Sequence, residues 1–591
     1  MIVPMKKIYI VLQKKDAVKA LNVLGNLGVL HIEHEMTPSG PPLEELRYDN
    51  QLLTKVINVL NNYPETQETK QTLPSTQWKS VAQEVLGQAA IVTQLKEDMA
   101  KRQTMIEELL PWGHFSLEDI RMLTEKGVYV FLGEADKNDL AKLPEGVIVK
   151  TISQSGKKIR LVVISDKRIE LPFPILPLPP MSLNEMQVLQ GQDQKKLQTA
   201  LDRLNELSAY QRSFEEILKE KMMELSFQEA LAGMGEAQEI VFLKGYSPSE
   251  NCSKIIQTAA KEHWALLIED PTTEDNVPTL LKNPKWIRLI EPLYQMMNII
   301  PGYRELDISP FFLIFFSIFF GLLVGDAGYG AIIMLATLIA HWKLGGRLPD
   351  KTIFYLNYVL SSVTIIWGLL TGTVFGTILL SQVFKPMLPW LTDIKNLQLL
   401  CFILGAVHLT ISHAWRLINK ITRPFGILGE IGWICLLWVS FFLAKAMILG
   451  EPFPSFIKMM VGIGIGLVVV EIIAQRQDVA VNLMLLIFSI ISAFTDVVSY
   501  IRLFAVGLAG VSVGDAFNRM ALDIGFHNPL AAIAATLILI FVHLFLNIAL
   551  AILGVLVHGI RLNMLEFSTH LNMEWSGTKY NPFRSYVRTV S

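Results

Sequence analysis

The chain has 591 residues, 51% of them hydrophobic, and a formal net charge of −2 at pH 7. This balance lacks the basic surplus that would suggest a nucleic-acid partner. The three cysteines, Cys252, Cys401 and Cys435, show no CxxC spacing, so the sequence indicates neither a zinc site nor a disulfide framework.

Two unlike halves make up the chain. Residues 1–305 are rich in Lys, Glu, Gln and Asp, whereas long apolar blocks follow one another from Ile308 onward. Such blocks are typical of a polytopic membrane protein. The opening sequence MIVPMKKIYIVLQKKDAVKA lacks the unbroken apolar core of a signal peptide, so we expect the first half to lie in the cytosol.

The cytosolic half is predicted to form a hairpin. Strand and helix patterns alternate in 1–40 and again in 236–300, which together predict a proximal α/β lobe. Charged segments with apolar residues at 3–4 spacing predict the arms of an antiparallel coiled-coil rod, 41–120 and 180–235. Residues 121–179 between the arms are predicted to form a distal α/β lobe.

Catalytic motifs are missing from this half of the sequence. It has no GxxxxGK[ST] phosphate-binding loop, because SGKKIR lacks the leading glycine and the spacing. The stretch HIEHE suggests a metal site. On a strand, however, His34 would face away from His31, Glu33 and Glu35, so a solvated strand end is the favoured interpretation. We expect the rod to bind other proteins.

Residues 306–591 are predicted to form a membrane domain of eight spans with a short cytosolic C-terminal tail. The first apolar block is long enough for two helices joined at GDAGYG (Gly325–Gly330). That split places two cation-rich loops, after the first and third blocks, on the cytosolic side, as the positive-inside rule requires. The apolar blocks are 309–342, 353–380, 397–418, 427–449, 457–474, 480–518 and 529–565. The loop cations are Lys343, Arg347, Lys351, Arg416, Lys420 and Arg423.

The last two apolar blocks are longer than a membrane requires. A helix over 480–518 would be roughly 58 Å long, against a hydrocarbon core of about 30 Å. We therefore expect two long, tilted helices that lie along a large partner inside the membrane.

An arginine inside the seventh span needs an explanation. Arg502 lies in SYIRLFAVGLAG, and a charge at the centre of a spanning helix costs roughly 2.5–3.5 kcal/mol on insertion scales. Asp496 is six residues away, about 120° around a helix, so the two are not a natural ion pair. Three interpretations compete: a structural pair with another helix, a substrate site in a secondary transporter, or a cation presented to a moving carboxylate on another subunit.

Three segments resemble a known family. They are GYRELDISPFFLIFFSIFFGLLVGDAGYG, SYIRLFAVGLAG and HGIRLNMLEFSTHLNMEWSGTKYNPF. All three are similar to hallmark segments of the membrane stator of V-type/A-type rotary ATPases, subunit a, which is called subunit I in bacteria and archaea. The opening MKKIYIVLQKKDAVKALNVLGNLGVLHIEHE is also similar, so the resemblance covers nearly the whole chain.

The resemblance implies a function and site residues. Arg502 matches the family's essential arginine, Arg561 its second arginine, and Glu566 the glutamate of its RLxxxEF pattern. In such stators two aqueous half-channels open on opposite membrane faces and an ion rides on a rotor carboxylate between them. ATP hydrolysis lies on other subunits, so the chain itself is not an enzyme and needs no cofactor.

The resemblance also implies partners and a location. The expected partners are the rotor ring of proteolipid c/K-type subunits, the peripheral-stalk E/G-type subunits, the central-stalk-side subunits and membrane lipid, with no nucleic acid. The expected location is the plasma membrane of a bacterium or archaeon, with both termini in the cytoplasm.

Half-channel residues cannot be copied from relatives, because Gly510 and Ala551 stand where eukaryotic relatives have histidine and glutamate. Candidates are therefore chosen as polar residues in apolar spans. For each one, a purely structural tie between helices is an equal alternative, and Asp326 in its glycine-rich hairpin favours the structural role. The candidates are Asp326, His408, His413, Glu430, Lys445, Glu471, Asp496, Ser499, Tyr500 and His558.

A self-contained secondary ion transporter with a regulatory cytosolic domain is the alternative function. It would predict internal inverted repeats. The only repetition is VGDA at 324–327 and 513–516, which is too short to count. The sequence does not decide between H⁺ and Na⁺ as the transported ion.

Overall fold

A computed structural model describes the chain except residues 64–72, 75–76, 114, 137–145, 156–157, 170, 180, 347, 349, 379–382, 422–423, 476–477, 526–527 and 585–591. Two of the loop cations used above, Arg347 and Arg423, and the end of the predicted C-terminal tail lie outside the described residues. The chain divides into two compact units. We call Met1–Ile8 with Gly245–Pro582 the membrane unit, and Tyr9–Lys244 with Phe583–Ser591 the N-terminal unit.

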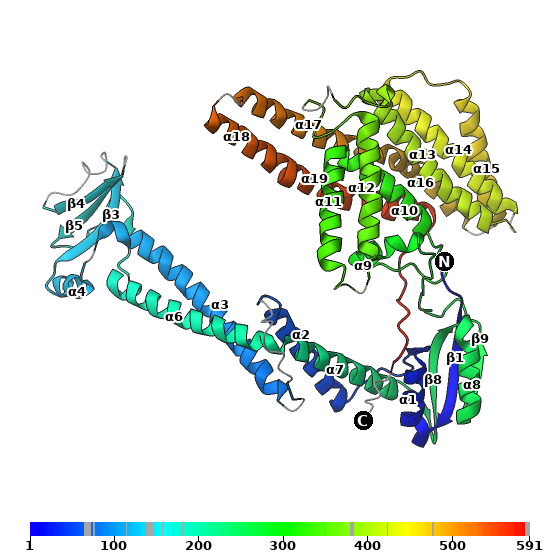
Figure 1. Ribbon diagram of the computed structural model, residues 1–591, viewed down its shortest axis with the longest axis horizontal. Coiled ribbons are helices and arrows are strands. Elements are labelled where there is room, and N and C mark those ends of the chain that lie inside the picture. The colour runs from blue at the N-terminus through cyan, green and yellow to red at the C-terminus, as the bar shows by residue number, and fades with distance from the viewer. Residues whose placement is uncertain are drawn as a thin grey trace. The chain divides into compact units, whose positions relative to one another are not determined.

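Long helices dominate the N-terminal unit. Helix α3 packs along α6, and α2 packs along α7 (Figure 1). The start of α6 is fixed by a capping box, in which the Ser182 hydroxyl accepts from the Glu185 amide and the Glu185 carboxylate accepts from the Ser182 amide. Buried apolar side chains such as Leu53, Val85 and Leu204 join these helices. The helices are α1 (Ala17–Leu27), α2 (Pro41–Leu60), α3 (Trp78–Leu109), α4 (Leu117–Glu125), α6 (Leu183–Leu207) and α7 (Gln211–Ala232).

A four-stranded sheet follows α4. Its order is β4-β5-β3-β6, and β5 is antiparallel to both β3 and β4. Ile159, Leu161 and Val163 alternate along β5 and are buried against Phe173, as expected of a sheet with one covered face. The strands are β3 (Tyr129–Asp136), β4 (Ile148–Ser155), β5 (Lys158–Ser165) and β6 (Ile175–Leu176).

A second sheet has the order β2-β8-β1-β9, with β7 paired to β8. The chain passes between the two units within β1 and again within β8. The strands are β1 (Met5–Gln13), β2 (His31–Glu33), β7 (Gly235–Ala237), β8 (Ile240–Pro248) and β9 (Ala265–Glu269), and helix α8 (Cys252–Glu262) lies between β8 and β9 in the chain. An N-terminal α/β part is therefore present, as predicted. The coiled-coil geometry of the rod and the lobe boundaries stay predictions.

Apolar helices fill the membrane unit. Among the described residues, seven helical stretches are long and apolar enough to cross a membrane. The helices are α9 (Glu291–Met297), α10 (Ser309–Val324), α11 (Ala327–Leu344), α12 (Thr352–Thr371), α13 (Ile394–Asn419), α14 (Pro424–Leu449), α15 (Ile457–Gln475), α16 (Val479–Ser499), α17 (Ile501–Ile524), α18 (Pro529–Ile540), α19 (Asn547–Gly554) and α20 (Ser568–His570). The multi-pass membrane half is thus present.

The first apolar block divides into α10 and α11. The break falls at Gly325, which adopts φ 70°, and Asp326, whose carboxylate caps α11. Helix α10 has 16 residues, so it is about 24 Å long and shorter than the hydrocarbon core. Most of its side chains are buried by neighbouring helices, including Phe312, Phe316 and Phe319. The predicted count of eight spans therefore depends on α10 and stays a proposal.

The last two apolar blocks form the longest helical stretches. They run over Val479–Ile524, with 46 residues, and Pro529–His570, with 42 residues. The first is interrupted at Tyr500, between α16 and α17. The second contains three π-helical segments, η7 (Phe541–Leu546), η8 (Val555–Gly559) and η9 (Leu562–Phe567). Such segments often occur at functional sites.

Candidate functional site

Three polar groups lie among the apolar helices of the membrane unit. We call Arg502, Arg561 and Glu566 the arginine cluster. We call Asp496, His570, His413 and Glu430 the histidine chain. We call Tyr329, His543, Asn518 and Asn547 the tyrosine–histidine network.

The arginine cluster is built around one carboxylate. Oε1 of Glu566 lies 3.3 Å from Nη1 of Arg502 and 3.5 Å from Nε of Arg561. In an α-helix, residues five apart such as Arg561 and Glu566 would point about 140° apart, whereas the wider π-helical turn of η9 brings them closer to one face. The Glu566 side chain is 4% exposed, but those of Arg502 and Arg561 are 29% and 48% exposed. The arginines therefore keep N–H donors available to a group outside the chain.

The histidine chain links four helices by hydrogen bonds. Asp496 Oδ2 on α16 lies 3.2 Å from His570 Nε2 on α20, and His570 Nδ1 lies 2.9 Å from His413 Nε2 on α13. His413 Nδ1 lies 2.7 Å from Glu430 Oε2 on α14. Asp496 thus pairs with His570, while Arg502 pairs with Glu566.

Two cations form ion pairs with Glu430 at one end of the histidine chain. The other Glu430 oxygen, Oε1, lies 2.6 Å from Lys420 Nζ and 3.0 Å from Arg416 Nη2. Lys420 also reaches Glu471 Oε1 on α15 at 3.2 Å. The Glu430 side chain is only 1% exposed, so these partners offset the large cost of burying its charge.

His408 and Tyr500 form a separate pair beside the arginine cluster. His408 Nδ1 lies 2.8 Å from the Tyr500 hydroxyl, and both side chains are buried. The His408 ring stacks between Phe315 and Phe567, with ring centroids 3.9 and 4.2 Å away. The Ser499 hydroxyl donates to the Asp496 carbonyl at 2.6 Å. These contacts hold the interruption at Tyr500, two residues before Arg502.

The tyrosine–histidine network joins α11 to the second half of the Val479–Ile524 stretch and to the first half of the Pro529–His570 stretch. The Tyr329 hydroxyl lies 2.7 Å from His543 Nδ1, and His543 Nε2 lies 2.8 Å from Asn518 Oδ1. Asn547 Nδ2 donates to the Tyr329 hydroxyl at 2.7 Å, and Asn518 Nδ2 donates to the Phe375 carbonyl at 2.7 Å.

Asp326 lies beside this network but serves the backbone. Its carboxylate accepts from the amides of Gly328, Tyr329, Phe375 and Gly376. Both carboxylate oxygens therefore accept from turn amides, three at Oδ1 and one at Oδ2, which fits the structural role.

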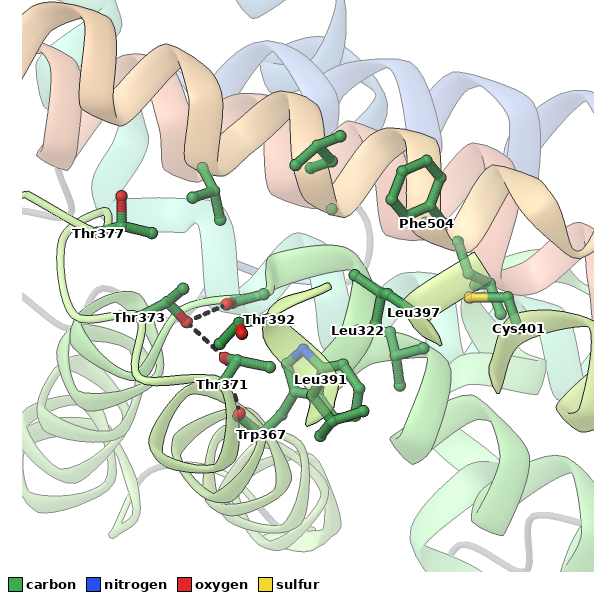
Figure 2. A pocket seen from close by; sticks show the side chains of 15 residues that line it. Leu322, Trp367, Thr371, Thr373, Thr377, Leu391, Thr392, Leu397, Cys401 and Phe504 are labelled. Carbon is green, nitrogen blue, oxygen red and sulfur yellow. Dashed lines mark hydrogen bonds between the residues drawn. The ribbon is translucent and has the colours of Figure 1, made fainter. Parts of the chain in front are cut away.

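An apolar pocket lies between α10, α12, α13 and α17 (Figure 2). Thr373 donates to the Gly325 carbonyl at 2.7 Å and is bonded to Thr371 at 2.9 Å, so these hydroxyls are satisfied within the protein. Trp367 and Cys401 add apolar surface. No predicted site residue lines this pocket.

Two further predicted residues belong to none of the three groups. Lys445 pairs with Glu451 at 2.6 Å. His558, together with Asn547 and Tyr329, lines a second pocket between α17 and α19, and its Nδ1 has no hydrogen-bond partner among the described residues. No group of three or more His, Cys, Asp or Glu in the part of the chain that the structure describes is placed to hold a metal ion.

Sequence reasoning missed several members of these groups. His570, Tyr329, Asn518, His543 and Asn547 were not among the candidates. His570 comes after the last apolar block, so the criterion of a polar residue inside an apolar span could not select it. Only the folded arrangement brings it between Asp496 and His413.

Comparison with known proteins gives full-length relatives. No family model matches the chain. V-type ATP synthase subunit I 1 of Treponema pallidum is 30% identical, covering 99% of this chain and 100% of its own length. V-type ATP synthase subunit I of Borreliella burgdorferi is 28% identical, covering 99% of both chains. A-type ATP synthase subunit I of Pyrococcus abyssi is 28% identical over 58% of this chain and 53% of its own.

The chain is also similar to a solved structure of a cytoplasmic domain. It is the crystal structure of the cytoplasmic N-terminal domain of subunit I, homolog of subunit a, of V-ATPase. The similarity covers 44% of this chain and 99% of that domain, with 13% identity and a TM-score of 0.24.

Proposed function

Because this chain belongs to the V-type/A-type ATP synthase subunit I family, a family of non-catalytic membrane subunits, we propose that it is the ion-translocating stator of a rotary ATPase. Arg502 faces a carboxylate on the rotor ring, two half-channels lead to it from opposite membrane faces, and ion flow is coupled to ATP hydrolysis or synthesis on other subunits.

The observation that carries this proposal is the incomplete pairing of Arg502. Glu566 meets it through a single contact of 3.3 Å, and 29% of the Arg502 side chain is exposed. A cation within about 4–6 Å lowers the pKa of a carboxylate by 1–3 units, so a rotor carboxylate that reaches Arg502 would release its ion. An arginine does not lose its own proton, so it blocks proton flow between the half-channels.

The two remaining polar groups are the proposed half-channels. The histidine chain lies where α13 ends, α14 begins and α20 closes the last stretch, next to Arg416 and Lys420. The positive-inside rule assigns this end to the cytosol. The tyrosine–histidine network lies toward the other ends of α17 and the last stretch, so it would serve the opposite face.

This orientation needs α10 to count as a span, which gives eight spans and cytoplasmic termini in a bacterial or archaeal plasma membrane. The helices of the N-terminal unit would act as a coiled-coil rod that anchors E/G-type peripheral stalks. The rotor ring of c/K-type subunits would lie against the two long helical stretches.

The test is ATP-driven ion uptake into proteoliposomes that contain the whole complex, with Arg502→Gln compared with the unaltered chain. Arg519→Gln is a matched control, because Arg519 is an exposed arginine on the same helix, α17. We expect uptake to vanish only with Arg502→Gln in complexes that assemble equally. Undiminished uptake would make Arg502 a structural charge.

A further inference from the structure

Filling every hydrogen bond of the histidine chain takes one proton more than two neutral imidazoles and two carboxylates supply. It contains three hydrogen bonds: Asp496 to His570, His570 to His413, and His413 to Glu430. Each bond needs one proton. A neutral imidazole carries one N–H, and an ionised carboxylate carries none. Two neutral imidazoles between two carboxylates therefore supply two protons for three bonds.

The third proton has four possible places. It can make His570 or His413 an imidazolium, or it can protonate Asp496 or Glu430. In each of these states all three hydrogen bonds keep a proton. Passing from one state to the next moves a proton across a single bond, from Asp496 Oδ2 through both imidazoles to Glu430 Oε2, or in reverse. No atom other than hydrogen has to move.

The tyrosine–histidine network does not share this property. Asn547 donates to Tyr329, the Tyr329 hydroxyl can donate to His543 Nδ1, and His543 Nε2 can donate to Asn518. Asn518 then donates to a carbonyl. One neutral imidazole satisfies every bond in a single arrangement, so the mobile proton is specific to the histidine chain.

The surroundings of the histidine chain favour protons over metal cations. The side chains of His413 and Glu430 are 3% and 1% exposed, and the His413 ring stacks on Trp433 with centroids 6.2 Å apart. Two successive imidazoles offer nitrogen, whereas hard cations such as Na⁺ prefer oxygen ligands. The charged groups around the chain are Arg416, which also donates to the His570 carbonyl at 2.9 Å, Lys420 and Glu471.

We propose that the histidine chain is a proton-conducting segment and that the ion carried by this subunit is H⁺ and not Na⁺. This inference rests on the proposed function, because the segment lies in series with the rotor site. Because every transported ion must pass this segment, a segment that conducts only protons determines that the transported ion is H⁺. This holds even if the rotor carboxylate by itself could also bind Na⁺.

The experiment measures H⁺ uptake and radioactive Na⁺ uptake in parallel, driven by ATP in proteoliposomes with the intact complex. We expect H⁺ uptake that is unchanged when Na⁺ is varied, and no Na⁺ accumulation. His413→Gln and His570→Gln keep a polar group but cannot relay a proton, so each should lower H⁺ uptake roughly 100-fold. His341→Gln is the control, since His341 is a hydrogen-bonded histidine of α11, 3.0 Å from the Tyr358 hydroxyl, that does not belong to the histidine chain.

Na⁺ accumulation by the unaltered complex would overturn the inference, and that measurement needs no variant to fold. Full H⁺ uptake by both histidine variants would overturn it as well. The two proposals fail in different ways. If Na⁺ accumulates and Arg502→Gln abolishes its uptake, the stator function stands and proton specificity falls. If Arg502→Gln transports normally, the stator function itself falls.

Discussion

Replacing Glu430 by glutamine should both destabilise the membrane unit and stop proton transfer. Glu430 is nearly fully buried, and its two oxygens meet His413 at 2.7 Å, Lys420 at 2.6 Å and Arg416 at 3.0 Å. Glutamine offers one acceptor oxygen and no charge, so at least one of the two partly buried cations, Arg416 at 20% and Lys420 at 29% exposure, loses its partner. Breaking a buried ion pair from one side costs about 3–5 kcal/mol.

The loss should be visible as a lower midpoint of thermal denaturation of the purified chain. At about 2 °C per kcal/mol for a unit of this size, we expect a decrease of roughly 6–10 °C. A second variant separates charge balance from proton transfer. Glu430→Gln combined with Lys420→Met removes one charge of each sign, so it should recover much of the midpoint but none of the H⁺ uptake. A midpoint within about 1 °C of the unaltered chain for Glu430→Gln would refute the reasoning.

Two further predictions concern packing and pH. The hydrogen bond from Arg102, at 2.8 Å, lowers the pKa of Asp193 in the folded protein. The ionised carboxylate therefore stabilises the α3–α6 contact fully at pH values above the pKa that Asp193 has in the unfolded chain. This stabilisation is lost as the pH falls through the lower pKa that Asp193 has in the folded protein. Asp193→Asn should therefore lower the free energy of opening of α3 and α6 by about 1.5–3 kcal/mol at pH 7, as measured by hydrogen exchange. The variant and the unaltered chain should have the same opening free energy in strong acid, where Asp193 is protonated. A difference that persists in strong acid would contradict this prediction. Gly368→Ala would place a Cβ 2.1 Å from the Ala327 amide nitrogen, so it should lower the midpoint of thermal denaturation. Gly462→Ala is the control, because open space surrounds Gly462 and the midpoint should not change. Equal midpoints for the two variants would contradict the packing account.

Parts of the fold follow from the sequence because they depend on local chemistry. The break in the first apolar block at Gly325 could be inferred from loop charge and from a glycine suited to a positive φ. The capping pair at the start of α6 and the alternation along β5 are likewise local patterns. The π-helical segments of the last stretch have no such local signature, so their positions could not be predicted.

The candidate site was predictable only in part. Arg502, Arg561 and Glu566 were selected from motif positions, but the sequence did not show that one carboxylate meets both arginines. The spacing of Asp496 and Arg502 indicated different partners, yet neither partner could be named. His570 is 157 residues from His413 in the chain, and only tertiary packing joins them.

The central claim is that Arg502 couples ion movement to the rotor, and the number of ions transported per ATP hydrolysed tests it most directly. This ratio is measured in the same proteoliposomes for Arg502→Gln and Arg519→Gln. The account predicts a ratio near zero for Arg502→Gln and an unchanged ratio for Arg519→Gln. An unchanged ratio for Arg502→Gln would contradict it.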